Sequence, residues 1–207
     1  FKNNKPQFIH KSSEKEYSIA FHHVHVMGQF LTAIHQTFEQ RKHDLRDIYI
    51  AENIEWILYH QDVTSKAMYW AHNAHVGNWV DNGIVDVAGH HLKKIYGNHY
   101  YNIATDFGNG EFFAFSQDWK METLSHGPLV EKTFTACLQS MGAPNTFLDI
   151  LSARKDVSLT NFLNSDFTIM SGAGAQIRNS TTEVKALGQA FDAILYLDQT
   201  HPIKWAD

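Results

Sequence analysis

F-D-A-I-L-Y-L, residues Phe191 to Leu197, is the stretch that decides the fold class of this 207-residue chain. Its apolar residues follow one another almost without interruption, which is typical of a strand buried within a sheet. A second strand is predicted over 100–107 and a third over 111–115, and the turn residues G-N-G at 108–110 join them into a hairpin. These stretches predict a sheet at the centre of a domain.

Helices are predicted between these strands. They cover residues 85–96, 128–141 and 159–163, and two further strands are predicted over 66–71 and 146–151. This alternation of strands and helices favours an α/β fold with a mixed or mostly parallel sheet flanked by helices.

The first part of the chain differs, because its pattern indicates a pair of long helices. A capping box, S-E-K-E from Ser13 to Glu16, predicts a helix that runs to about Arg41, and Asp44 is placed to cap a second helix. We therefore expect an added helical segment over 1–61, followed by the α/β portion over 62–207. The first helix carries an apolar stripe formed by Ala20, Val24, Met27, Leu31 and Ile34.

Composition excludes several classes of protein. Hydrophobic residues make up 43% and charged residues 19% of the chain, so intrinsic disorder is excluded. The net charge of −5 argues against nucleic-acid binding. The apolar runs are too short to cross a membrane, and a single cysteine cannot form an internal disulfide. We expect a cytoplasmic protein, and the sequence says nothing about its oligomeric state.

The most informative motif is W-A-H-N-A-H, from Trp70 to His75, which stands where the predicted strand over 66–71 ends. Ligands of open α/β sheets bind outside the carboxyl ends of strands. His72 and His75 are therefore candidate catalytic residues, each able to act as a general base or to donate to a developing oxyanion. Asn73 can orient an imidazole or donate to a substrate carbonyl. The alternative is that one histidine caps the strand end and the other is solvated.

Metal binding is a second interpretation of the histidines, of which the chain has 14. His72 and His75 are three residues apart, as are His22 and His25, and this spacing suits zinc ligands. No H-E-x-x-H motif and no cysteine pair accompanies them. We therefore expect no metal and no other cofactor.

Polar residues elsewhere are weaker candidates. Arg46, Glu52 and Asn53 lie in the predicted second helix, where residues seven apart share a face. Glu111 lies on a predicted strand among aromatic residues, and a buried carboxylate would need a partner. The alternative for all four is an ordinary solvated surface.

Several of these segments together resemble the erythromycin esterase family, whose bacterial members are often labelled succinoglycan biosynthesis proteins. R-D-I-Y-I-A-E-N, from Arg46 to Asn53, resembles the family's R-D-x-x-M-A-E-N helix. W-A-H-N-A-H, from Trp70 to His75, resembles its W-A-H-N-x-H core motif. The segment 101–115 and the strand 191–196 are similar to the pieces that follow. The resemblance runs from about residue 40 to the end of the chain.

The resemblance implies a hydrolase that cleaves a small-molecule carboxylic ester or lactone by metal-independent attack of water. His72 and His75 then fall on active-site histidines, and Arg46 and Glu52 fall within or near the pocket. Asn53, Asn73 and Glu111 are the candidate substrate-binding residues. The α/β sheet with an appended helical part is also what the family implies.

One family motif is missing from the sequence. The family carries G-E-x-x-H-G-T ahead of its R-D-x-x-M-A-E-N helix, and the histidine of that motif is assigned as the base that activates water; no such motif occurs here. Since the chain starts at Phe1, we expect that the N-terminal part of the family domain is absent from it. We also expect that residues 1–207 alone do not hydrolyse esters.

Two alternative functions remain open. One is a non-catalytic protein associated with polysaccharide biosynthesis, or a binding protein, that uses the same cleft. The other is a metal-dependent hydrolase, which would hold a stoichiometric metal that His72→Ala removes.

Overall fold

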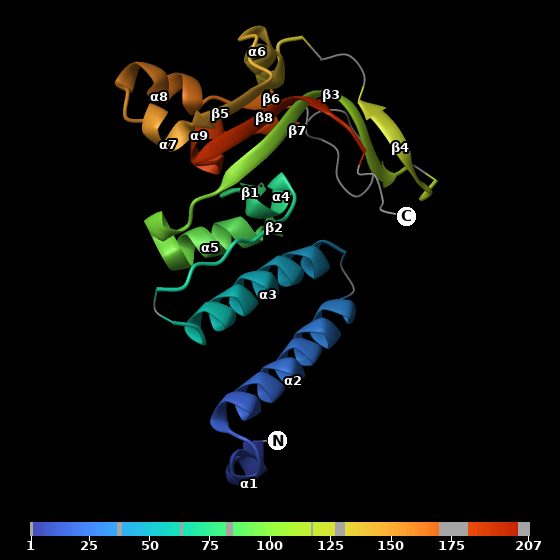
Figure 1. Cartoon of the computed structure of the whole chain (residues 1–207), viewed down its shortest axis with the longest axis vertical. Coiled ribbons are helices and arrows are strands. Elements are labelled where there is room, and N and C mark those ends of the chain that lie inside the picture. Colours follow the sequence, from blue (N-terminus) through green and yellow to red (C-terminus); the bar gives the residue numbers. More distant parts are fainter. Residues whose placement is uncertain are drawn as a thin grey trace. The chain divides into compact units, whose positions relative to one another are not determined.

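The computed structural model describes residues 2–36, 39–62, 64–81, 85–116, 118–126, 131–169 and 182–202. The chain divides into two compact units. The helical unit comprises residues 1–67 and 80–86, and the sheet unit comprises residues 68–79 and 87–207. Figure 1 labels the helices and strands of both.

The helical unit is built on two long helices that pack against each other. The capping box predicted at the start of the first is confirmed, because Ser13 Oγ accepts a hydrogen bond from the backbone N–H of Glu16 at 3.1 Å. The unit's elements are η1 (Lys2–Asn4), α1 (Lys5–Lys11), α2 (Glu14–Ile34), α3 (Glu39–Tyr59) and the short antiparallel strands β1 (Val80–Asp81) and β2 (Val85–Asp86).

Two predicted boundaries in this unit are wrong. The first helix ends at Ile34 and not near Arg41, and the second begins at Glu39, so Asp44 lies inside α3 and does not cap it. The chain must reverse direction after α2 so that the two helices can pack. The reversal begins with a tight turn at the end of α2, in which the N–H of Gln36 donates to the Ala33 carbonyl.

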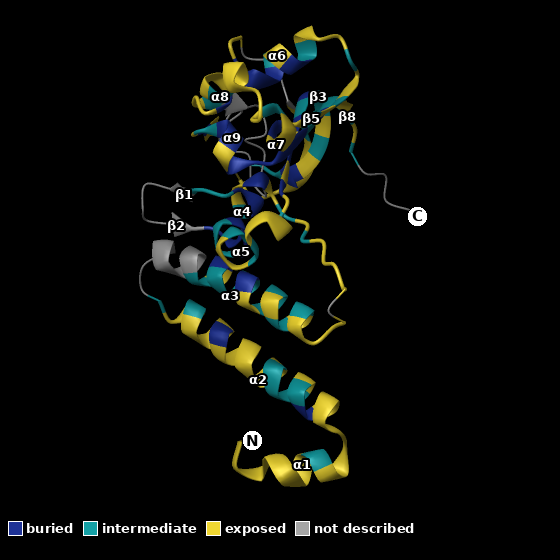
Figure 2. Ribbon diagram, turned by 90° about the vertical axis from the view of Figure 1, so that its left-hand side faces the viewer, coloured by how far each residue is buried: buried dark blue, intermediate teal, exposed yellow. Residues whose placement is uncertain are grey.

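The predicted apolar stripe on α2 is also largely exposed within this chain. Met27 is 65% exposed and Leu31 is 51% exposed. The buried side chains of α2 are instead Tyr17 and Gln29. Figure 2 shows the same contrast, since most of α1 and α2 is coloured as exposed.

The sheet unit confirms an α/β fold with a mixed sheet. Its four strands lie in the order β4-β3-β8-β5, in which β3 and β8 run parallel and the other neighbouring pairs run antiparallel. The predicted F-D-A-I-L-Y-L strand is confirmed as β8 (Ala193–Thr200). The other strands are β3 (Ile103–Phe115), β4 (Met121–His126), β5 (Asn145–Asp149) and the separate antiparallel pair β6 (Phe167–Ile169) and β7 (Thr182–Val184).

Short helices connect these strands. They include α5 over the predicted 85–96 region and α8 over the predicted 159–163 region. Their bounds are α4 (Asn73–Val76), α5 (Ala88–Tyr96), η2 (Gly97–His99), α6 (Phe134–Ser140), α7 (Ile150–Ala153), α8 (Val157–Leu163) and α9 (Leu187–Ala190). The helix predicted over 128–141 begins only at Phe134, where Thr133 caps it by accepting from the N–H of Ala136; residues 127–130 lie outside the described part of the chain.

The predicted hairpin turn at 108–110 is wrong, because these residues lie inside the continuous strand β3. Gly110 has a φ of +128°, and a Cβ there would lie 2.2 Å from the carbonyl oxygen of Thr200. A Cβ at Gly108 would meet the Tyr196 hydroxyl at 2.5 Å. The glycines are therefore needed for the close approach of β8, and the true hairpin joins β3 to β4.

The predicted strand over 66–71 is also wrong. This segment has no regular secondary structure, and its Met68 and Trp70 side chains are 88% and 83% exposed. It spans the junction at which the helical unit ends, at Ala67, and the sheet unit begins. An apolar run becomes a strand only where a neighbouring strand supplies its backbone partners, and no described strand pairs with 66–71.

The hydrophobic core of the sheet unit lies between β3, β8 and the helices around them. Its largest fully buried side chains include Tyr196, Phe191 and Leu187. Figure 2 shows buried residues gathered around β8 and α9. The core fixes the amino-terminal ends of β3 and β8, against which the histidine motif is held.

Candidate functional site

The histidine motif forms a tight turn at the start of the sheet unit. His72 is the N-cap of α4, with an extended backbone, and its ring Nδ1 accepts a hydrogen bond from the N–H of Ala74 at 3.2 Å. Its carbonyl accepts from the N–H of His75 at 2.8 Å. His72 is exposed and His75 is half-buried. The structure thus places both predicted catalytic histidines on one turn of chain.

This cap determines which ring nitrogen carries the proton when His72 is neutral. A ring nitrogen that accepts from a backbone N–H carries no proton, so the neutral imidazole bears its proton on Nε2. An Nε2–H is a hydrogen-bond donor. The geometry therefore equips His72 to donate to a negatively charged oxygen.

Asn73 fixes this turn to the sheet. Its side-chain Nδ2 donates to the Thr105 carbonyl at 2.7 Å, and its Oδ1 accepts from the Thr105 N–H at 2.9 Å. Asn73 is buried. Both hydrogen-bonding groups of its amide thus serve the backbone of β3, which gives Asn73 a positioning role that the sequence did not reveal.

The end of the turn is anchored as firmly as its beginning. The Val76 carbonyl accepts from the Tyr100 hydroxyl at 2.7 Å and from Asn102 Nδ2 at 2.9 Å. Burial raises the pKa of Tyr100 well above its usual range, so its hydroxyl stays protonated and keeps donating. A Cβ at Gly89 would lie 2.2 Å from the same carbonyl, so only glycine lets α5 approach it.

Glu111 lies on the same sheet but far along it. It is exposed on β3 and stands opposite Ser125 of β4. Six residues of extended strand separate it from Thr105, which corresponds to about 20 Å. The structure therefore does not bring Glu111 to the turn that Asn73 anchors.

The other three predicted site residues belong to α3, in the helical unit. Arg46 is half-exposed, and its NH2 and Nε each lie 3.4 Å from Asp47 Oδ1, whose carboxylate is buried. These distances are at the long end for hydrogen bonds, so the pair is held loosely. Asp47 is a buried acidic residue that sequence reasoning missed.

Glu52 and Asn53 are joined through a residue of the other long helix. Gln29 donates from Nε2 to Glu52 Oε2 at 2.9 Å and accepts on Oε1 from Asn53 Nδ2 at 3.1 Å. The Oδ1 of Asn53 is buried without a hydrogen-bond partner among the described residues. Sequence reasoning missed Gln29. The available signal was its spacing on α2, because it lies four residues after His25 and seven after His22 and therefore shares their helix face.

His22 and His60 lie in a row of rings on the same helical pair. The His22 ring stacks on Trp56 with centroids 3.7 Å apart, and Trp56 stacks on His60 at 4.0 Å. Ser18 Oγ lies 2.9 Å from His60 Nε2. Burial lowers the pKa of His22, and the neighbouring His25, His23 and His60 lower it further.

No group of three or more His, Cys, Asp or Glu side chains among the described residues is arranged to hold a metal ion. No described helix is long and apolar enough to cross a bilayer.

The sheet unit is thus a mixed α/β sheet whose strand β3 holds the histidine turn. The chain belongs to the erythromycin esterase family, whose model matches residues 1–200. The match begins at the first residue and not near residue 40, as the motifs alone suggested, so it includes the helical unit.

Solved structures share the fold. A crystal structure of a Bacillus cereus protein superposes with a TM-score of 0.82 at 23% identity, and a crystal structure of a succinoglycan biosynthesis protein superposes with a TM-score of 0.77 at 24% identity. They cover 100% and 97% of this chain, which spans 50% of the length of each. No curated protein sequence matches the chain.

Proposed function

We propose that this protein hydrolyses a small-molecule carboxylic ester or lactone, and that His72 and His75 act at the reacting carbonyl. The observation that carries the proposal is the cap of α4, which directs the His72 proton to Nε2. Membership of the erythromycin esterase family supports the reaction class.

The reaction is an acyl transfer to water. The water oxygen bonds to the carbonyl carbon while a base takes its proton, and the carbonyl oxygen becomes an oxyanion. The oxyanion then reforms the carbonyl and expels the alcohol oxygen, which takes up a proton. His72 Nε2–H stabilises the oxyanion, and His75 positions the water or shares that role. These 207 residues hold no G-E-x-x-H-G-T motif, so the base is not assigned to a residue of this chain.

The remaining site residues keep proposed roles that rest on the family resemblance. Arg46 stabilises negative charge or holds a substrate oxygen, and Glu52 supports it. Asn53 binds substrate through its buried Oδ1, which has no hydrogen-bond partner in the described part of the chain and suits a donor group of a ligand. Asn73 is another proposed substrate contact, although it also holds the turn in place. Glu111 is proposed to contact only a distant part of an extended substrate, because it lies about 20 Å along β3 from Thr105.

The route of the reaction is tested with labelled water. The full-length protein that carries this chain is incubated with a panel of carboxylic esters and macrolide lactones in H₂¹⁸O, and the products are analysed by mass spectrometry. Attack at the carbonyl puts one ¹⁸O into the acid product. Label in the alcohol, or no turnover of any substrate, contradicts the proposal and favours the non-catalytic alternative.

The metal content of the protein distinguishes the proposed metal-independent hydrolysis from the metal-dependent alternative. We expect the purified protein to keep its activity after treatment with a chelator and to contain no stoichiometric metal by elemental analysis. A stoichiometric metal that is lost in His72→Ala, together with activity, would assign His72 as a ligand and overturn its proposed role as an oxyanion donor.

A further inference from the structure

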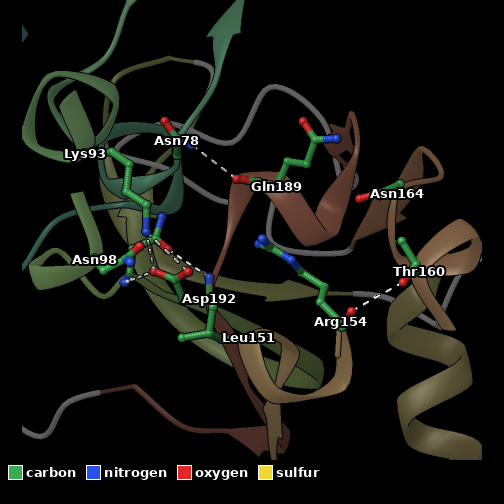
Figure 3. Close-up of a pocket in the computed structure, with 10 residues that line it drawn as sticks. Asn78, Lys93, Asn98, Leu151, Arg154, Thr160, Asn164, Gln189 and Asp192 are labelled. Carbon is green, nitrogen blue, oxygen red and sulfur yellow. Dashed lines mark hydrogen bonds and ion pairs between the residues drawn. The ribbon is translucent and has the colours of Figure 1, made fainter. Parts of the chain in front are cut away.

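A hollow lies in the sheet unit, at the amino-terminal ends of β3 and β8. Its volume is about 530 Å³, which is within the range of small-molecule sites. Neither His72 nor His75 lines it. The lining is dominated by charged and amide side chains, among them Lys93, Asn98, Arg154, Asn164, Gln189 and Asp192 (Figure 3).

One side of the hollow is formed by a network of hydrogen bonds between Lys93, Asp192 and the backbone. The Asp192 carboxylate is buried and accepts from the Asn102 N–H at 3.1 Å and from Lys93 Nζ at 3.3 Å. Lys93 Nζ also donates to the Tyr100 carbonyl at 3.1 Å. The charges of Lys93 and Asp192 therefore balance each other, and this side of the hollow keeps its shape without a ligand.

Arg154 provides the unbalanced charge of the hollow. It follows α7, and its NH1 donates to the Gly188 carbonyl at 2.6 Å, which holds the guanidinium in place. No acidic side chain among the described residues forms an ion pair with it. Figure 3 shows the guanidinium reaching into the space between Gln189 and the Lys93–Asp192 pair.

The other polar groups of the wall are amides. The side chains of Asn98, Asn164 and Gln189 each offer both a donor and an acceptor, as a hydroxyl group requires. A guanidinium binds a carboxylate with two parallel hydrogen bonds. The wall thus combines one carboxylate-binding group with several hydroxyl-binding groups.

We propose that this hollow binds a sugar acid, a monoanionic polyhydroxylated ligand whose carboxylate pairs with Arg154 and whose hydroxyls bind the amides. Among the described lining residues, the positive charge of Arg154 is the one without an acidic partner, and it matches one carboxylate. A phosphate dianion would bring a second negative charge close to the Asp192 carboxylate. This site is distinct from the proposed site of ester hydrolysis, because neither His72 nor His75 lines it, although Asn102 lines it and also holds the Val76 carbonyl.

The test is a titration of the full-length protein with glucuronate, glucose and inorganic phosphate, followed by calorimetry. We expect glucuronate to bind at least about tenfold more tightly than glucose, which has the same ring without the carboxylate. Arg154→Gln should weaken glucuronate binding by about 10- to 100-fold. Lys155→Gln removes the same charge from the neighbouring exposed residue, and it should leave binding within about twofold.

Several outcomes would overturn the proposal. No glucuronate binding up to about 10 mM, equal binding of glucose, or equal effects of Arg154→Gln and Lys155→Gln would do so. Phosphate that binds as tightly as glucuronate and competes with it would make the hollow a general anion site. If Arg154→Gln fails to fold, Asn164→Ala on the exposed end of α8 serves instead, with an expected loss of about three- to tenfold.

Discussion

Asn73 and Thr105 are joined by two hydrogen bonds, in which one side-chain amide serves both the N–H and the carbonyl of a single strand residue. Among the described residues β4 pairs with β3 from Gly110 to Phe115, so Thr105 lies outside this described pairing. The amide of Asn73 supplies there the partners that a neighbouring strand would have supplied. Because Asn73 lies between His72 and His75 in the sequence, these hydrogen bonds also hold both histidines beside Thr105.

Replacement of Asn73 by alanine should destabilise the protein. It removes both hydrogen bonds between the buried Asn73 side chain and the backbone of the exposed Thr105, so we expect a loss of about 1 to 3 kcal/mol in the free energy of unfolding, measured in urea. Asn161→Ala, on the exposed face of α8, is the matched control and should change it by less than about 0.5 kcal/mol. A loss in Asn73→Ala no larger than in the control would show that the clamp does not hold the turn.

Gly110→Ala should disrupt the pairing of β3 with β8. The new Cβ would lie 2.2 Å from the Thr200 carbonyl oxygen, at a φ of +128° that alanine rarely adopts. We expect a loss of at least about 3 kcal/mol, by thermal or urea unfolding. Gly97 also has a positive φ, but nothing lies within 4 Å of its Cβ position. Gly97→Ala should therefore cost less, about 1 to 3 kcal/mol of backbone strain alone, and equal losses would refute the close approach of β8.

Two substitutions of His72 distinguish its role as the N-cap of α4 from its proposed role in catalysis. His72→Ala removes the acceptor for the Ala74 N–H and should cost about 1 kcal/mol of stability. Asparagine is a good N-cap residue, so His72→Asn should keep stability within about 0.5 kcal/mol of the wild type. Both variants lack the imidazole. Equal stability of all three proteins would mean that Nδ1 does not cap α4 and that the proton on Nε2 is not fixed by it.

The stability of the helical unit should fall in mild acid because of His22. Its pKa in the folded protein is lowered from 6.5, so the unfolded chain binds the proton more tightly. The stabilising contribution is present above pH 6.5 and is lost as the pH falls through the lowered pKa. We expect the thermal midpoint to fall less steeply between about pH 7 and 5 in His22→Gln than in the wild type.

The matched control for this pH dependence is His10→Gln, at an exposed position on α1. It should leave the slope of midpoint against pH unchanged. A slope that is the same in His22→Gln and the wild type would mean that burial and the neighbouring histidines do not favour the neutral form of His22.

Local patterns predicted the elements whose signals are local. The N-cap at Ser13 and the strand F-D-A-I-L-Y-L depend on neighbouring residues, and both are confirmed. The hairpin at Gly108 to Gly110 failed because glycine serves both turns and close contacts between strands, and only β8 decides which. The strand predicted over 66–71 was wrong because an apolar stretch alone cannot show whether a neighbouring strand exists to pair with it.

The candidate site was predictable in the same partial way. The sequence placed His72 and His75 together because they lie on one turn. It could not reveal that Asn73 binds Thr105, or that Asn102 binds Val76, because these partners are 32 and 26 residues apart. The link from Gln29 to Glu52 and Asn53 was hidden for the same reason, since it joins two helices.

The most direct test of the account compares kcat/KM of the full-length protein and its His72→Asn variant on the best ester of the panel. His72→Asn keeps the cap and removes the Nε2–H donor, so the account predicts a loss of about 10²- to 10³-fold. His99→Asn, an exposed histidine of η2, should leave kcat/KM unchanged. A loss below about threefold in a folded His72→Asn protein would contradict the central claim that His72 stabilises the oxyanion.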